Sequence, residues 1–129
     1  MDMRLELVPL PTSDVDRSKE FYVDRLGFNL DHDVQPGNGL RVVQLTPPGS
    51  ACSIVVGVGI SDPNAPRVLN LHLVVDDIEE ARGHLLSKDI NVSGVSDMGG
   101  VKYAHFSDPD GNSWALQELP RRSSAAASS

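Results

Sequence analysis

The feature that most constrains the fold is an internal repeat. A shift of 63 residues sets Asp14 against Asp77 and Tyr22 against Leu85, and the pattern of apolar residues around these pairs is repeated with them. Self-similarity at a fixed period indicates that one supersecondary unit is present in two copies. The chain has 129 residues, of which 40% are hydrophobic, so it is long enough to bury a core.

Both copies show the same order of elements. Runs of alternating or β-branched apolar residues predict strands, and a helix with one apolar face begins at each aspartate of the repeat. Ser13, Asp14 and Asp16 are all suited to cap the first helix, and Gly27 is suited to end it. The predicted strands are 5–11, 28–34, 40–46, 52–58, 68–75, 90–95, 101–107 and 113–119, and the predicted helices are about 14–26 and 77–88.

This order predicts an α+β fold of two tandem βαβββ modules that form curved mixed sheets. We place the first module at residues 1–56 and the second at residues 68–119. The stretch 57–67 is rich in glycine and proline and is predicted to link them. Residues 120–129, composed mainly of serine, alanine and arginine, are predicted to form a disordered tail.

Composition excludes several classes of function. The net charge of −7 argues against nucleic-acid binding, which requires a basic face. No apolar run approaches the length of a membrane span, and the first residues lack the apolar core of a signal peptide, so we expect a cytoplasmic protein. Cys52 is the only cysteine, which leaves no intrachain disulfide and no cysteine-based zinc cluster.

The segment "DPDG" at 108–111 predicts a tight turn between two antiparallel strands. Pro109 fixes φ at one central position of the turn, and Gly111 can adopt the positive φ that such a turn needs. We therefore interpret Asp108 and Asp110 as structural residues of the turn. The turn would set the register of strand 113–119, in which a slip of one residue would exchange the two faces.

At this point a resemblance to a known family is visible. The two βαβββ copies, the opening "SDVDRSKEFY…LGF" and the close "FSDPDGNSW" resemble the vicinal oxygen chelate superfamily, which includes glyoxalase I, bleomycin-resistance proteins and extradiol dioxygenases. The resemblance covers residues 4–119. It implies that ligands bind on the concave faces of the sheets, and that a chain of this length forms a homodimer.

The resemblance also raises the question of a metal. Metal-dependent members hold a divalent ion with four His or Glu side chains from the first and last strands of each copy. The matching positions here are Leu7, Ser53, Asn70 and Ala115. Leu7 and Ala115 cannot ligate a metal, and Asn70 and Ser53 are weak ligands. We therefore predict that the protein has no metal centre of this type and no other cofactor.

The remaining candidates line the strand faces opposite the helices. Imidazole and phenol groups there can contact a ligand or transfer protons, so His72, Tyr103 and His105 are the candidate catalytic residues. The second copy would supply a polar wall and the first copy a mostly apolar one. The predicted ligand-binding residues are Leu7, Ser53, Val55, Asn70, His72, Tyr103, His105, Ala115 and Gln117.

These residues suit a small, partly apolar organic molecule, bound without a metal as in the bleomycin-resistance members. Loop 94–100 is short and rich in glycine, so we expect the cup to be open on that side. An enzyme of the same superfamily is the alternative. It would be a metal-free isomerase or lyase that uses His and Tyr groups as acid and base, or a divalent-metal lyase or dioxygenase with a non-standard ligand set such as His72, His105 and a water. The sequence leaves binding and catalysis open.

Overall fold

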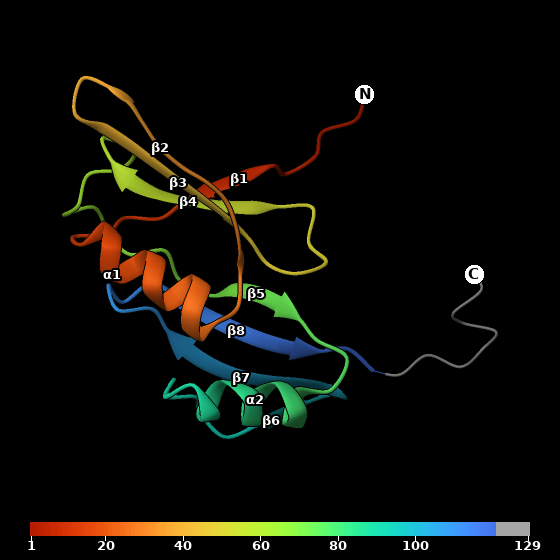
Figure 1. The fold of residues 1–129 in the computed structure, drawn as a ribbon. Helices are drawn as coiled ribbons and strands as arrows, with labels where there is room; N and C mark the ends of the chain where they lie inside the picture. The colour runs from red at the N-terminus through yellow and green to blue at the C-terminus, as the bar shows by residue number, and fades with distance from the viewer. Residues whose placement is uncertain (121–129) are drawn as a thin grey trace. The chain divides into compact units, whose positions relative to one another are not determined.

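Each half of the chain forms a four-stranded sheet with a helix beside it (Figure 1). The computed structural model describes residues 1–120, so most of the predicted tail, 121–129, lies outside the described residues. The first half contains β1 (Leu7–Pro9), α1 (Val15–Glu20), the π-helical turn η1 (Phe21–Arg25), β2 (Asn29–Gly37), β3 (Leu40–Thr46) and β4 (Ser53–Val58). The second half contains β5 (Leu71–Val74), α2 (Ile78–Ser87), β6 (Ser96–Met98), β7 (Val101–Ser107) and β8 (Ser113–Glu118).

The two sheets have the same topology. The strand order is β1-β4-β3-β2 in one and β5-β8-β7-β6 in the other. In both sheets the first strand of the half pairs in parallel with the last, whereas the pairs β2–β3, β3–β4 and β6–β7 are antiparallel. The predicted α+β fold of two tandem βαβββ modules with mixed sheets is therefore confirmed.

The described residues divide into two compact units, which we treat separately. The first unit is Met1–Asn70 together with Ser107–Ser113, and the second is Leu71–Phe106 together with the chain from Trp114 onward. The turn that joins β7 to β8 thus belongs to the first unit. The predicted module end at residue 56 falls inside β4, and the module limits 1–56 and 68–119 remain a prediction.

The core of the first unit lies on one face of its sheet. Alternation along β3 and β4 puts the buried Val43, Leu45, Ile54 and Val56 on that face. Phe21 and Tyr22 of η1 are buried with them, at 5% and 0% exposure. Burial of such apolar side chains stabilises the unit by about 1.5–3 kcal/mol each.

Ion pairs connect α1 to the same sheet face. Asp33 of β2 accepts hydrogen bonds from Arg41 at 2.9 Å and from Lys19 at 2.8 Å, and Arg41 also reaches Asp16 at 2.9 Å. Arg41, followed by Lys19, holds the pKa of the Asp33 carboxyl far below its usual range. The network therefore fixes the helix over this face at neutral pH.

In the second unit the core lies on the face beside α2. Trp114 and Leu116 of β8 are buried and pair with Leu71 and Leu73 of β5. The ring of Phe106 lies parallel to that of Trp114, with centroids 6.3 Å apart. The buried residues of the helix are Ile78 and Leu85. The prediction that Trp114 and Leu116 face inward is borne out by their burial.

Two local predictions are wrong. The strand predicted at 90–95 is absent, and β6 occupies 96–98 within the stretch predicted to be an open loop at 94–100. Ile90 and Val92 are buried, which explains the alternation that suggested a strand. The backbone N–H of Ser93 donates to the His105 carbonyl at 2.9 Å, but the N–H of His105 donates to the Ser93 hydroxyl and not to its carbonyl, so this pair does not continue into a regular ladder.

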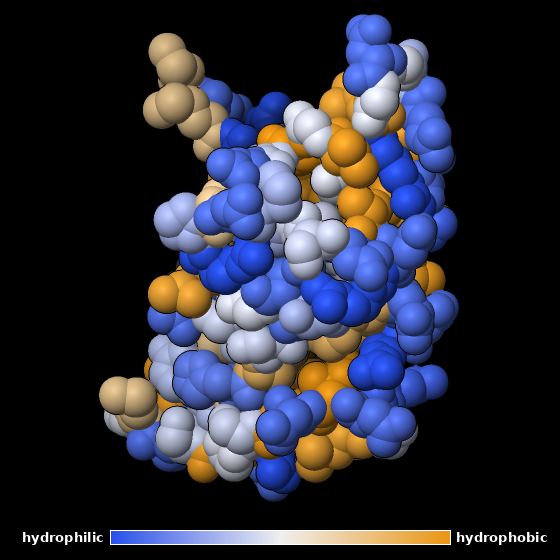
Figure 2. Space-filling view, turned by 90° about the vertical axis from the view of Figure 1, so that its left-hand side faces the viewer, coloured by the Kyte–Doolittle hydropathy of each residue, from blue (hydrophilic) through white to orange (hydrophobic). Residues whose placement is uncertain are grey.

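Among residues 1–120, no helix is long and apolar enough to cross a membrane. Figure 2 shows one side of the molecule, where hydrophilic side chains predominate and hydrophobic ones gather in smaller patches.

Candidate functional site

The predicted polar face is present in the second unit. The partner residues of β5 and β8 share a face, so His72 lies beside Ala115 and Val74 beside Gln117, on the side opposite Trp114 and Leu116. Tyr103 and His105 lie two residues apart on β7, the other neighbour of β8, so alternation puts them on one face too. The same alternation that buries Trp114 thus directs these polar side chains away from α2.

Three of these side chains form a continuous set of rings. The His72 and Tyr103 rings meet edge to face, with centroids 5.9 Å apart and an angle of 87° between the planes. The Tyr103 and His105 rings are nearly parallel, with centroids 6.4 Å apart. Both separations lie within the range of favourable aromatic contacts.

Gln117 orients the middle ring. Its side-chain amide donates a hydrogen bond of 3.3 Å to the Tyr103 hydroxyl oxygen. Tyr103 and Gln117 are half-buried, His72 and His105 are exposed, and Ala115 has 0% exposure. A phenol whose oxygen already accepts one hydrogen bond can still donate its own proton to a ligand.

The predicted residues of the first copy lie on the equivalent face of the other sheet. Leu7 pairs with Ser53, and Pro9 pairs with Val55. Leu7 is 38% exposed, whereas Ser53 and Val55 are buried. This group belongs to the first unit, and His72, Tyr103, His105, Ala115 and Gln117 belong to the second.

Sequence reasoning missed a polar cluster on that first sheet. Thr46 donates to the carboxylate of Asp31, and its oxygen lies 2.6 Å from the hydroxyl of Ser53. Because the Thr46 proton points to Asp31, Ser53 is the donor in the second bond. Gln44 also donates to Asp31, at 3.4 Å. Alternation in 40–46 could have placed Gln44 and Thr46 on this face, so the wall is more polar than expected.

Asn70 is the predicted site residue whose position departs most from the expected strand. It has φ of 61° and lies just before β5, which begins at Leu71 and not at residue 68. Alternation therefore does not place Asn70 on the face of His72. Asparagine tolerates this left-handed conformation better than most residues, and the Asn70 N–H donates to the Ser113 hydroxyl at 2.8 Å.

The turn at 108–112 is a structural element of the first unit. Asp108 is buried and accepts hydrogen bonds from the Tyr22 hydroxyl and from Asn112. Gly111 has φ of 93°, as the predicted turn requires. These contacts agree with our interpretation of the turn as structural.

Asp110 joins this turn to the start of α1. Its carboxylate accepts from the Ser13 backbone at 2.9 Å and from the Thr12 hydroxyl at 2.6 Å, and it pairs with Arg17 at 2.9 Å. Burial alone would raise the pKa of Asp110, but these hydrogen bonds and the charge of Arg17 outweigh it and lower the pKa below its usual value.

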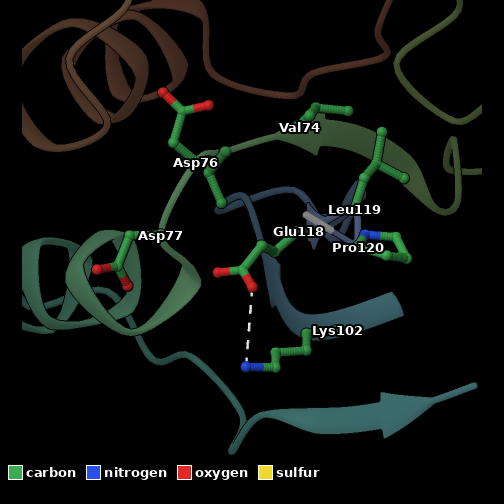
Figure 3. A pocket seen from close by; sticks show the side chains of 8 residues that line it. Val74, Asp76, Asp77, Lys102, Glu118, Leu119 and Pro120 are labelled. Carbon is green, nitrogen blue, oxygen red and sulfur yellow. Dashed lines mark ion pairs between the residues drawn. The ribbon is translucent and has the colours of Figure 1, made fainter. Parts of the chain in front are cut away.

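A hollow of about 630 Å³ lies in the second unit at the end of β5 and β8, next to the polar face, and Val74 lines it (Figure 3). Glu118 and Lys102 point toward one another there, 3.7 Å apart, and Glu118 also accepts from the backbone of Ile78 at 2.9 Å. These groups stabilise the start of α2, and none of the predicted site residues lines the hollow. Its lining residues are Val74, Val75, Asp76, Asp77, Lys102, Glu118, Leu119 and Pro120.

Comparison with known families agrees with the fold. The family model of the glyoxalase/bleomycin resistance protein/dioxygenase superfamily matches residues 4–116. The chain belongs to this superfamily. A search of curated proteins finds no match.

Solved structures of the glyoxalase/bleomycin resistance type resemble about nine tenths of the chain. TnmS3, an antibiotic binding protein from Streptomyces sp. CB03234, is 33% identical with a TM-score of 0.80, over 92% of this chain and 97% of that one. A glyoxalase/bleomycin resistance protein from the same organism is 35% identical with a TM-score of 0.74, over 88% and 98%. A superfamily member from Sphaerobacter thermophilus DSM 20745 is 28% identical with a TM-score of 0.79, over 92% and 98%.

In this chain, the residues at the positions that hold the metal in metal-dependent glyoxalases do not suit a metal ion. Leu7 and Ala115 carry no donor atom, and the Ser53 hydroxyl is engaged with Thr46. Within residues 1–120, no three His, Cys, Asp or Glu side chains are grouped so that they could hold an ion. The residues present are thus not those that bind zinc or iron in proteins.

Proposed function

We propose that this protein binds a small, partly apolar organic molecule of the antibiotic type and holds it without the metal of the metal-dependent glyoxalases. The observation that carries the proposal is the similarity to an antibiotic binding protein at 33% identity over 92% of the chain. The proposed place is the face of β5, β8 and β7 that carries His72, Tyr103, His105 and Gln117. The proposed setting is the cytoplasm, with no role for nucleic acid.

The chemistry of this face supports the proposal. Val74 is 62% exposed beside the half-buried Gln117, so apolar and polar surface lie next to each other on paired strands. Burial of apolar surface would supply most of the affinity, at about 25 cal/mol per Å². The phenol, the imidazoles and the amide would fix the orientation of the ligand.

The test begins with a thermal-shift screen of purified protein against a panel of hydrophobic antibiotics. For any compound that raises the melting temperature, we expect His72→Gln, His105→Gln and Tyr103→Phe to weaken binding about 5- to 150-fold, the effect of losing one buried hydrogen bond. His84→Gln, an exposed histidine on α2, is the control and should bind as the wild type does. Unchanged affinity in all three variants would show that the ligand binds elsewhere.

The metal part of the proposal has its own measurement. Elemental analysis of purified protein should find no transition metal near one ion per chain, and EDTA should leave the thermal shift unchanged. Stoichiometric zinc, iron, manganese or nickel that is lost in His72→Ala would contradict it. Chemical conversion of the bound compound, followed by mass spectrometry, would favour the enzyme alternative.

A further inference from the structure

The ring contact between His72 and Tyr103 crosses a strand. His72 is on β5 and Tyr103 is on β7, and β8 lies between these strands. Neighbouring strands are about 4.8 Å apart, so side chains standing upright on β5 and β7 would be separated by roughly 9–10 Å. The ring centroids are only 5.9 Å apart, so the two rings converge over β8.

The residue of β8 beside His72 is Ala115. The two residues are partners in the parallel pair, and Ala115 has 0% exposure. Its single methyl group leaves the space above β8 that the converging rings use. A long side chain at this position would project into the same space, as side chains on one face of neighbouring strands compete for volume.

The small size of Ala115 therefore has a consequence for the shape of the face. With the rings brought together, His72, Tyr103 and His105 form a row of three, which we name the ring platform. Gln117 holds its middle member through the hydrogen bond to the Tyr103 hydroxyl. Two of the three rings are exposed, so part of the platform is open to a ligand.

We infer that the ring platform selects ligands with a flat, conjugated ring system, and that Ala115 is the residue that determines this specificity. The inference rests on the proposed function and names the class of compound that the same face takes. Flat rings gain contacts with aromatic side chains beyond the burial of their area, whereas saturated rings of the same size gain the burial alone. A glutamate at position 115 would disrupt the platform, because its long side chain would occupy the space of the rings and its charge would lie beside them.

The experiment uses two probes with the same carbon skeleton, 2-naphthol and decahydro-2-naphthol, which share one hydroxyl and differ in aromaticity. Binding to the full chain is measured by saturation-transfer NMR titration. We expect the aromatic probe to bind at least about fivefold more tightly. Tyr103→Leu and Ala115→Glu should abolish this preference, whereas Ala115→Ser, which stays small, should retain it.

Circular dichroism and melting curves show whether each variant is folded. If Ala115→Glu does not fold, Tyr103→Leu tests the ring platform and Ala115→Leu, which is long and uncharged, tests the role of Ala115. Equal affinity for both probes, or a preference that survives Tyr103→Leu, would overturn the inference and leave the proposed function standing. If neither probe nor any member of the antibiotic panel binds, the proposed function fails, and the inference fails with it.

Discussion

At the scale of single residues, buried polar groups do most to specify this structure. Asp108 is a carboxylate at 5% exposure whose oxygens accept from the Tyr22 hydroxyl at 2.7 Å and from the Asn112 side chain at 2.8 Å. A buried carboxylate without such donors would be costly, because burial removes its water. The turn motif is therefore stabilised by a tyrosine more than 80 residues away in the sequence, which spacing within the motif does not reveal.

The first prediction concerns this contact. Tyr22→Phe removes the hydroxyl and leaves the buried Asp108 with one donor fewer, so we expect a loss of about 1–3 kcal/mol in the free energy of unfolding. Urea denaturation measures it. The matched control is Tyr103→Phe, the same chemical change at a half-buried position, which should alter stability by less than about 0.5 kcal/mol. Equal effects of the two changes would contradict the assigned role of Tyr22.

Site residues were predictable from sequence to the extent that strand alternation is regular. His72, Tyr103, His105 and Gln117 were expected on one face, and contacts between their side chains bring them together. Asn70 differs because its positive φ interrupts the alternation just before β5. A single asparagine in the sequence does not predict this backbone conformation. The ligand role of all these residues remains a prediction.

At the scale of elements, the strands with clear apolar alternation were predicted best. β3 and β7 begin and end at the predicted residues, 40–46 and 101–107. The prediction for 90–95 failed because buried apolar residues alternate there without a regular ladder of backbone hydrogen bonds, and periodicity does not distinguish this case from a strand. The π-helical turn after α1 was also invisible, since it changes the backbone hydrogen bonds and not the apolar pattern.

The second prediction compares two glycines in different elements. A Cβ on Gly57 of β4 would lie 1.9 Å from the backbone oxygen of Arg41, so Gly57→Ala must push β3 and β4 apart. We expect a loss of more than about 2 kcal/mol, measured by thermal or urea unfolding. Gly83→Ala lies on α2, where a Cβ meets nothing within 4 Å, and should stabilise the protein by about 0.5–1 kcal/mol. If both variants changed the free energy of unfolding in the same direction, this account would be contradicted.

The third prediction concerns the pH dependence of the contact between the turn and α1. The pKa of Asp110 is lowered in the folded protein, so its contribution to stability is present above the unfolded pKa of about 3.9. That contribution is lost as the pH falls through the folded pKa, below that value. Asp110→Asn should therefore lose less stability than the wild type between pH 6 and pH 3.

Urea denaturation at the two pH values gives this difference for each protein. Asp2→Asn is the control, because the side chain of Asp2 is 87% exposed, and its loss on acidification should equal that of the wild type. If Asp110→Asn and the wild type lost the same stability on acidification, the carboxylate would not hold the turn to the helix in its charged form.

At the scale of the whole molecule, the repeat determined the architecture. Each copy of the unit forms one sheet, and one face of each sheet must be buried. In this arrangement each sheet has two edge strands. In the strand order of each sheet, β1 and β2 are terminal in the first and β5 and β6 in the second. Edges invite pairing or coverage by another surface. Exposed apolar side chains are also present, such as Leu5 at 72% and Met98 at 68%.

The fourth prediction is that two copies of the chain associate as a homodimer. Association would cover strand edges and apolar side chains that the described residues leave at the surface, and closed two-fold dimers are the commonest assembly of soluble chains. Light scattering after size exclusion, at micromolar concentration, should give close to twice the mass of one chain, 13.9 kDa. A stable dimer interface buries about 1,200–2,000 Å² and should survive dilution to the low micromolar range. A single species of monomer mass throughout the dilution series would contradict the prediction, and each chain would then have to bind its ligand with its own residues alone.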